Sequence, residues 1–253
     1  MVTYNVGTSD ERNLEYSKKF NREQVLRRLI KEKNPVIFDV GANDGLSLQE
    51  FKSWWNGSIV HCFEPQEECL SLMKKRMRDL SISDVILNKV AVGDKTEKNV
   101  NFFSHELTTG LSGFNKININ SVDSIRIDEL KKESNNKLEE HYSKLNHERF
   151  VDILRLDEYM NNAGINHVDL LKIDTQGYEP EVISGLGERL SDVNVIVTEL
   201  MLYDYYERSM SFSDIELYLL PAGFKLYDIS SISKNPMNGR TDWVDVIYVR
   251  NEN

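Results

Sequence analysis

The feature that most constrains this chain is a short apolar run followed by a turn with two glycines. Residues 36–40 read Val-Ile-Phe-Asp-Val, broken only by Asp39, as expected of a strand buried on both faces of a parallel sheet. Gly41 and Gly45 bracket a tight turn, and apolar residues continue at helical spacing over 46–55. A strand, a glycine turn and a helix in this order are typical of a nucleotide-binding unit at the carboxyl edge of an α/β sheet.

The turn matches neither of two common phosphate-binding motifs. Its pattern, Gly41-Ala42-Asn43-Asp44-Gly45, lacks the G-x-G-x-x-G spacing of a dinucleotide fingerprint and the Gly-Lys-Ser/Thr ending of a P-loop. Asp39, two residues before the first glycine, instead favours a ligand with a cationic or amine end, such as S-adenosylmethionine (SAM). The alternative is an ordinary strand-to-helix turn, because short glycine motifs have many chance matches.

A second acid favours the first of these interpretations. Residues 59–63 form another short apolar run, which ends in Glu64-Pro65. Glu64 lies about 20 residues beyond the turn, where a carboxylate can accept both ribose hydroxyls of an adenosine. Its alternative role is a charge at a helix N-terminus, favoured by the helix dipole. Pro65 predicts the start of a helix over 66–79.

The rest of the chain alternates between strand and helix patterns. The expected strands cover 85–92, 100–103, 150–156, 168–174, 193–200, 224–229 and 243–249. The expected helices cover 157–163, capped by Asp157 and closed by Gly164, then 180–190 and 213–219. Because the last two strands have only a loop between them, this order predicts a mostly parallel sheet with an antiparallel end.

Two regions lie outside this core pattern. We expect residues 1–35 to form an N-terminal arm, loose over 1–20, followed by a helix that Asn21 and Gln24 begin, and residues 36–253 to form the main domain. A charged helical insertion is expected at about 115–149, following a loop rich in Ser, Thr, Gly and Asn. A solvated face is the favoured reading of this insertion, and a lid or a dimer contact is the alternative.

Composition excludes several classes of function. The formal net charge of −10 repels phosphate backbones, so we expect no nucleic-acid partner. No apolar run approaches the ~20 residues of a membrane helix, and the polar start predicts no signal peptide. The two cysteines, Cys62 and Cys69, lack metal or redox spacing, which fits reduced thiols and a cytoplasmic protein.

Six motifs together resemble the FkbM family of SAM-dependent methyltransferases. They are IFDVGANDG at 37–45, Phe63-Glu64-Pro65, VAVGD at 90–94, Leu156-Asp157-Glu158, the block Leu171-Lys172-Ile173-Asp174 with Gly177 and Glu179, and Glu199. The resemblance covers roughly residues 36–250. It implies a Rossmann-like class I methyltransferase fold: a mostly parallel seven-stranded sheet, an antiparallel terminal strand and helices on both faces. It also implies O-methylation of a sugar or another small hydroxylated acceptor.

The same motifs identify the residues expected to bind the cofactor, SAM. These are Asp39, Gly41, Ala42, Asn43, Gly45, Glu64, Pro65, Val90, Ala91 and Asp174. The alternatives to small-molecule methylation are methylation of a peptide or glycan-linked acceptor and a non-catalytic SAM-binding protein. A homo-oligomer is compatible with the sequence.

Three residues are candidates for catalysis. Asp174 and Glu199 each end an expected strand, so both should emerge at the carboxyl edge beside the glycine turn. Asp174 could remove the proton of an acceptor hydroxyl. The pair could instead hold Mg²⁺, which is less favoured than catalysis, helix capping or contact with the methionine end of SAM. His105 lies in the loop expected to reach the pocket and is a further candidate base.

The tyrosines at 203, 205 and 206 follow Glu199 closely. They could stack on a sugar ring or pack against the sheet edge, and the sequence does not separate these roles.

Overall fold

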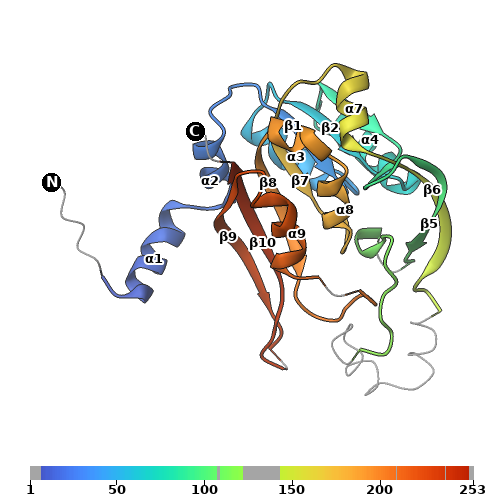
Figure 1. Ribbon diagram of the computed structural model, residues 1–253. Helices are drawn as coiled ribbons and strands as arrows, with labels where there is room; N and C mark the ends of the chain where they lie inside the picture. The colour runs from blue at the N-terminus through green and yellow to red at the C-terminus, as the bar shows by residue number, and fades with distance from the viewer. Residues whose placement is uncertain (1–6, 107–108, 122–142, 209, 237, 251–253) are drawn as a thin grey trace.

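The computed structural model describes residues 7–106, 109–121, 143–208, 210–236 and 238–250 (Figure 1). In chain order the elements are α1 (Ser9–Lys19), α2 (Arg22–Leu29), β1 (Val36–Val40), α3 (Leu46–Trp54), β2 (Ile59–Phe63), α4 (Glu67–Asp79), β3 (Val85–Asn88), β4 (Ala91–Val92), β5 (Glu97–Ser104), the 3₁₀ turn η1 (Thr109–Leu111), β6 (His147–Leu154), α7 (Leu156–Ala163), β7 (Val168–Ile173), α8 (Glu179–Ser184), the 3₁₀ helix η2 (Gly187–Asp192), β8 (Val193–Met201), α9 (Phe212–Leu219), β9 (Phe224–Lys234) and β10 (Thr241–Arg250).

The main sheet has seven strands in the order β3-β2-β1-β7-β8-β10-β9. The pairs from β3 to β8 are parallel, and β10 is antiparallel to both of its neighbours. This confirms the predicted α/β fold, a mostly parallel seven-stranded sheet with an antiparallel terminal strand. The antiparallel strand is last in sequence, but it lies between β8 and β9 rather than at the edge. The order reverses at β1, which is where α/β sheets bind ligands.

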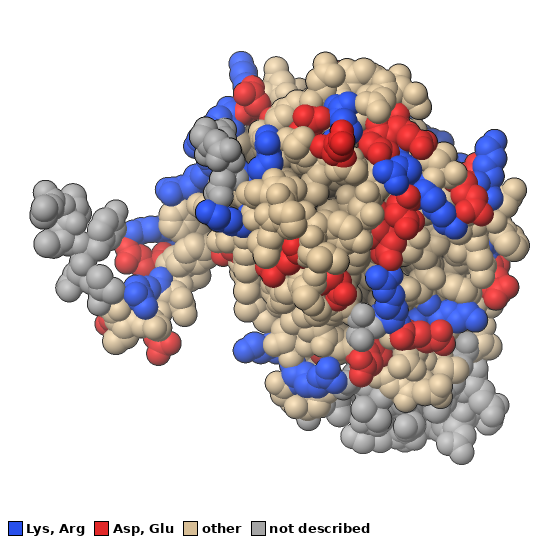
Figure 2. Space-filling view, viewed as in Figure 1, with Lys and Arg blue, Asp and Glu red and all other residues tan. Residues whose placement is uncertain are grey.

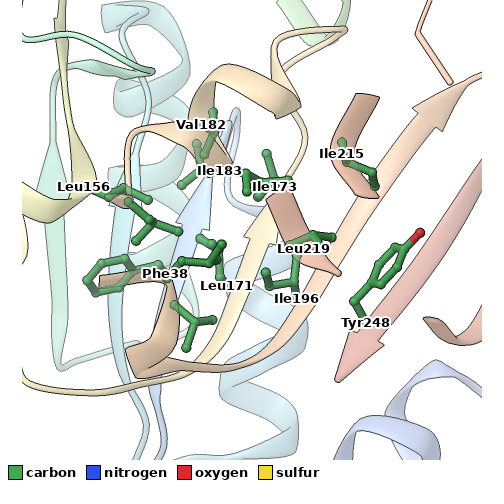
Figure 3. Close-up of a cluster of buried hydrophobic side chains, with 14 of the residues drawn as sticks. Phe38, Leu156, Leu171, Ile173, Val182, Ile183, Ile196, Ile215, Leu219 and Tyr248 are labelled. Carbon is green, nitrogen blue, oxygen red and sulfur yellow. The ribbon is translucent and has the colours of Figure 1, made fainter. Parts of the chain in front are cut away.

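Each face of the sheet carries its own hydrophobic core, because the buried strands alternate their side chains between the faces. Helices α2, α3 and α4 supply Leu26, Phe51 and Met73 to one core. The opposite core joins α7, α8 and α9 to β1, β7 and β8 and contains Phe38, Leu156, Leu171, Ile173, Val182, Ile183, Ile196, Ile215, Leu219 and Tyr248 (Figure 3). Helices on both faces were predicted and are confirmed.

A second sheet, in the order β4-β6-β5, was not predicted. The expected strand at 85–92 is split, since β3 ends at Asn88 and β4 pairs with β6 in the other sheet. At the break the Asn88 side-chain amide donates to the Cys62 carbonyl at 3.1 Å. The expected strand at 100–103 is longer than predicted and forms antiparallel pairs with β6.

The described part of the N-terminal region contains one more helix than its sequence suggests. Residues 9–19 form α1, where a loose arm was expected, because Thr8 and Glu11 make a reciprocal capping box. No residue of α1 is buried, and the helix stands apart from the body in Figure 1. It contacts the edge strand through the Tyr16 hydroxyl, which donates to Asp228 at 2.7 Å. The predicted Asn21–Gln24 cap of α2 is confirmed.

Other predicted boundaries are partly corrected. Asp157 lies in the first turn of α7 and is not its cap, which is Arg155. Most of the predicted charged insertion, residues 122–142, lies outside the described residues. Residues 147–149 belong to β6 and not to a helix. Within the described parts of the chain, no helix is long and apolar enough to cross a membrane.

Candidate functional site

A cavity lies at the carboxyl edge of the main sheet, beside the ends of β1, β2 and β7. It is lined by Val40, Gly41, Asn43, Phe63, Glu64, Pro65, Gln66, Ala91, Val92, Phe102, Thr109, Gly110, Ser112, Phe114, Asp174, Thr175 and Gln176. Six of the predicted site residues are therefore brought together: Gly41, Asn43, Glu64, Pro65, Ala91 and Asp174. The three strands are neighbours in the sheet, so residues more than 130 positions apart meet here.

The glycine turn is fixed by close backbone contacts. The Gly41 N–H donates to the Phe63 carbonyl at 3.0 Å. Gly41 has φ +73°, and a Cβ there would lie 1.8 Å from the backbone oxygen of Asp174. Gly45 has φ +84° and precedes α3, where a Cβ would lie 2.7 Å from Met73. The turn therefore requires glycine both for its backbone conformation and for its packing.

Glu64 connects the turn to the end of β2. Its carboxylate accepts the Asn43 N–H at 3.0 Å and the Gln66 N–H at 2.9 Å. Burial raises the pKa of Glu64, and these hydrogen bonds act against that rise. Each carboxylate oxygen has more than one acceptor position, so Glu64 can hold the turn and still face a ligand in the cavity.

Lys172 lies beneath the cavity with its ammonium between two acids. Its Nζ is 3.4 Å from Asp39 Oδ1 and 3.4 Å from Asp174 Oδ2, and it donates to the Gly41 carbonyl at 3.1 Å. Burial lowers the pKa of Lys172, but the charges of Asp174 and Asp39 outweigh burial and raise it above the ordinary value. Lys172 is therefore a permanent cation that ties Asp39 in β1 to Asp174 at the end of β7.

Six predicted site residues do not line the cavity. Asp39, fully buried, accepts from the Ser47 hydroxyl at 2.6 Å. Ala42 is buried in the core, Val90 packs against the opposite core, and Gly45 begins α3. Glu199 lies within β8 behind Asp174, with its carboxylate 3.3 Å from Gln176 Nε2. None of these five residues lines the cavity, and the sixth is His105.

His105 does not reach the cavity, contrary to expectation. It is 4% exposed, and its Nδ1 accepts the Asn146 N–H at 3.0 Å. Burial, followed by the neighbouring His147, lowers the pKa of His105 to about 4. Its imidazole is therefore neutral at physiological pH, and it is hydrogen-bonded to the backbone of Asn146.

The cavity wall that sequence reasoning missed comes from the segment after β5. Thr109 donates through its hydroxyl to Asn43 Oδ1 at 2.8 Å, and the Gln66 amide donates to the Thr109 carbonyl at 3.3 Å. Gly113 exchanges backbone hydrogen bonds with Phe103 at 2.8 and 3.0 Å. The unusual Ser, Thr and Gly content of this segment was the available signal, but it did not indicate which residues face the cavity.

Tyr205 and Tyr206 are buried and do not line the cavity. Their exposed fractions are 5% and 2%, and they lie in a small core with Ile117, Leu145 and Met201. This settles their position against the sheet edge and not on the cavity surface. Among the residues that the structure describes, no group of three or more His, Cys, Asp or Glu side chains is placed to hold a metal.

The strand order and the cavity at the carboxyl edge define a class I methyltransferase fold. The chain matches the methyltransferase FkbM domain family over residues 39–226, and it belongs to that family.

Individual relatives share about a quarter of their residues with this chain or fewer. The 2-O-methyltransferase NoeI of Sinorhizobium fredii is 27% identical over 194 residues, which is 77% of this chain and 74% of NoeI. Methyltransferase sdnD of Sordaria araneosa is 26% identical over 204 residues, covering 76% and 74% of the two chains. The methyltransferase FkbM structure from Methylobacillus flagellatus has a TM-score of 0.51 at 14% identity. That match covers 86% of this chain and 44% of the other, and at such low identity it shows the fold alone.

Replacing Gly41 tests the contact between the turn and β7. Both Gly41 and Gly164 have left-handed φ, +73° and +65°, but a Cβ at Gly164 meets nothing within 4 Å. Gly164→Ala should therefore lower the free energy of unfolding only by the cost of holding alanine at a left-handed φ, about 1–2 kcal/mol. Gly41→Ala adds a collision with the Asp174 backbone and should lose at least twice as much free energy of unfolding in urea titrations. Equal losses would contradict the proposed packing of this turn.

Glu179 provides a test of pH dependence. Its Oε1 accepts the Thr175 N–H at 2.9 Å, while its buried Oε2 has no hydrogen-bond partner. Burial raises the pKa of Glu179 from 4.5 to about 7. Between these values the folded protein keeps a proton that the unfolded chain has released, so the free energy of unfolding falls as pH rises.

Glu179→Gln removes this titration. Between about pH 4.5 and pH 7, the free energy of unfolding of the wild-type protein should fall, relative to that of the variant, by up to about 1.4 kcal/mol per pH unit. Urea unfolding of both proteins at pH 5 and pH 8 measures the change. A difference between the two proteins that stays constant with pH would show that Glu179 is ionised throughout.

Proposed function

We propose that this protein is a SAM-dependent methyltransferase that methylates a hydroxyl of a small acceptor such as a sugar. The observation that carries the proposal is the meeting of the glycine turn, Glu64 and Asp174 at one cavity. Family membership supports methyl transfer, and the similarity to a protein named as a 2-O-methyltransferase supports an oxygen acceptor. Neither the family nor this similarity identifies the class of acceptor, so the sugar is part of the proposal.

The residues at the cavity fit SAM. Glu64 presents a buried carboxylate suited to ribose hydroxyls, and Pro65, Ala91 and Phe102 offer apolar surface suited to an adenine ring. Asp39 does not line the cavity, but its Oδ1 is buried without a hydrogen-bond partner 3.4 Å from the Lys172 ammonium. When bound, SAM supplies a methyl group on a positively charged sulfur, so a site rich in carboxylates is electrostatically suitable.

The cavity must widen to admit such a ligand. It encloses about 70 Å³, whereas small-molecule sites commonly measure about 300–1,000 Å³. The wall at 109–114 is attached by side-chain and turn contacts and not by a long strand pairing. We infer that this wall moves when the cofactor enters.

Asp174 is the residue proposed to accept the proton of the acceptor hydroxyl. It is the more open of the two acids here, with 37% of its side chain exposed. Glu199 differs, because burial and then the charges of Asp174 and Asp245 raise its pKa strongly. Burial therefore favours the protonated form of Glu199, which leaves Asp174 as the acid proposed to act as the base.

Other parts of the proposal concern partners and location. We propose a small-molecule acceptor and no nucleic-acid partner, since the chain carries a net charge of −10 and its acidic and basic side chains are interspersed over the face in Figure 2. Cys62 and Cys69 are both free and buried, which supports a reducing, cytoplasmic setting. Mg²⁺ at Asp174 and Glu199 remains the less favoured alternative.

Glu64→Ala tests cofactor binding. The variant leaves the two ribose hydroxyls without a charged acceptor, which should weaken SAM affinity about 10-fold or more. Isothermal titration calorimetry measures the change. Glu67→Ala is the control, since Glu67 is exposed on α4 and should leave affinity unchanged. Unchanged affinity in Glu64→Ala would remove Glu64 from the cofactor site.

Asp174→Asn tests the chemistry. The substitution keeps the shape and removes the base, so kcat should fall by about 10²-fold or more while SAM affinity changes little. Methyl transfer from labelled SAM to a panel of neutral sugars provides the assay. A large loss of SAM affinity would instead assign Asp174 to the cofactor. Activity that survives EDTA would exclude a required metal, and activity lost on chelation and restored by Mg²⁺ would overturn direct proton abstraction.

A further inference from the structure

We propose that Gln176 and Tyr206 form an amide clamp, in which the Tyr206 hydroxyl holds the Gln176 side chain and Gln176 positions the Asp174 carboxylate. The role of the clamp in catalysis rests on the proposed function, whereas the geometry of the clamp is independent of that function. Neither residue was identified from the sequence as a contributor to chemistry.

The backbone of Gln176 indicates that its position is specified. It follows β7 in the turn before α8 and has φ +59°, in the left-handed region that non-glycine residues rarely adopt. Gly177, the next residue, also has positive φ, +90°. A strained conformation persists only when the surroundings hold it, and such residues concentrate at functional sites. Here the strain directs a nearly buried side chain, 8% exposed, along the cavity wall.

The hydrogen bonds of Gln176 use every group of its amide. Nε2 donates to Asp174 Oδ1 at 2.7 Å and to Glu199 Oε2 at 3.3 Å. Oε1 accepts from the Tyr206 hydroxyl at 2.7 Å. An ionised carboxylate can only accept, so the amide NH₂ must face Asp174 and the amide oxygen must face the tyrosine.

Tyr206 is suited to fix that orientation. It is 2% exposed, and burial raises its pKa well above the ordinary value, so its hydroxyl remains protonated and able to donate. The same hydroxyl also lies 3.0 Å from the Leu111 carbonyl, at the end of η1. The clamp therefore extends from the wall of the cavity to the acid at its base.

The clamp acts on the oxygen of Asp174 that Lys172 does not reach. Gln176 contacts Oδ1, and the Lys172 ammonium is 3.4 Å from Oδ2. With one partner on each oxygen, a partly exposed carboxylate is held in one rotamer and keeps acceptor positions free on both atoms. Holding a base at fixed distance and angle contributes to rate without contributing to substrate affinity.

The charged and titratable groups of this cluster come from four strands and two helices. Lys172 and Asp174 come from β7 and its end, Asp39 from β1, Glu199 from β8, Asp245 from β10, Glu179 from α8 and Arg22 from α2. Lys172 forms the ion pair with Asp174, and Gln176 supplies an uncharged donor between Asp174 and Glu199. Removing Gln176 takes a hydrogen-bond donor from the Asp174 carboxylate, which disfavours its ionised form.

Kinetics of three variants test the clamp. Gln176→Leu removes a hydrogen bond to the Asp174 carboxylate and should lower kcat about 10-fold or more. Tyr206→Phe acts on Asp174 only through Gln176 and should lower kcat somewhat less. KM for the acceptor should change less than kcat. The acid limb of the kcat–pH profile should move to higher pH in Gln176→Leu. Tyr205→Phe is the matched control, since Tyr205 is also buried and packs on the Tyr206 ring but makes no hydrogen bond to Gln176, and it should match wild type.

A second readout does not depend on activity. In the free protein, the ¹⁵N-labelled side-chain amide resonances of Gln176 should shift in Asp174→Asn and in Tyr206→Phe, but not in Tyr205→Phe. Resonances insensitive to Asp174→Asn would overturn the clamp, even if methyl transfer is observed. If the resonances respond as expected but the wild-type protein neither binds SAM nor transfers methyl groups, the clamp stands and the proposed function fails. Kinetics equal to wild type in Gln176→Leu would overturn the positioning role.

Discussion

The structure of the site depends on one buried cation, Lys172. A charge in the interior of a sheet is tolerated only when paired, and removing one partner leaves an uncompensated charge that is strongly destabilising. Lys172 meets this requirement with Asp39 from β1 and Asp174 at the end of β7. Because β1 and β7 are neighbours, the ion pairs fix the two acids relative to each other and place one of them at the cavity.

The same region is fixed a second time by backbone packing. Lys172 also donates to the Gly41 carbonyl, and the α-carbon of Gly41 faces the Asp174 carbonyl so closely that no Cβ fits. The glycine turn and the end of β7 are therefore one packed unit. Under the proposed function, this packing would keep a cofactor at the turn and the proposed base Asp174 at a constant separation, as transfer between two bound groups requires.

Much of the fold was predictable because its signals are local. Apolar runs located the strands at 36–40, 59–63, 168–174 and 193–200, and glycine and acid spacing located the turn and Glu64. The second sheet was not predictable, since β4 and β5 pair with β6 more than 40 residues away and short runs do not reveal such partners.

Site residues show the same limit. The strand order alone predicts that an acid at a strand end, such as Asp174, lies at the carboxyl edge of the sheet. The positions of His105 and Val90 could not be predicted from motif spacing, because their burial depends on the residues that pack around them. Gln176 carried no signal of its own. Its role depends on a tyrosine 30 positions later and on a backbone angle, and neither leaves a pattern in the sequence.

The wall of the cavity joins the two halves of the site. At one end the Thr109 hydroxyl bonds to Asn43 in the glycine turn, and at the other the Leu111 carbonyl lies beside the Tyr206 hydroxyl, which holds Gln176. A ligand large enough to displace this wall alters both contacts together. When the Leu111 carbonyl moves away, the single proton of Tyr206 is left to Gln176 alone, and its bond to the amide strengthens. If the cofactor displaces this wall as proposed, its entry at the turn is coupled to the Asp174 carboxylate through the side chains of Thr109, Tyr206 and Gln176.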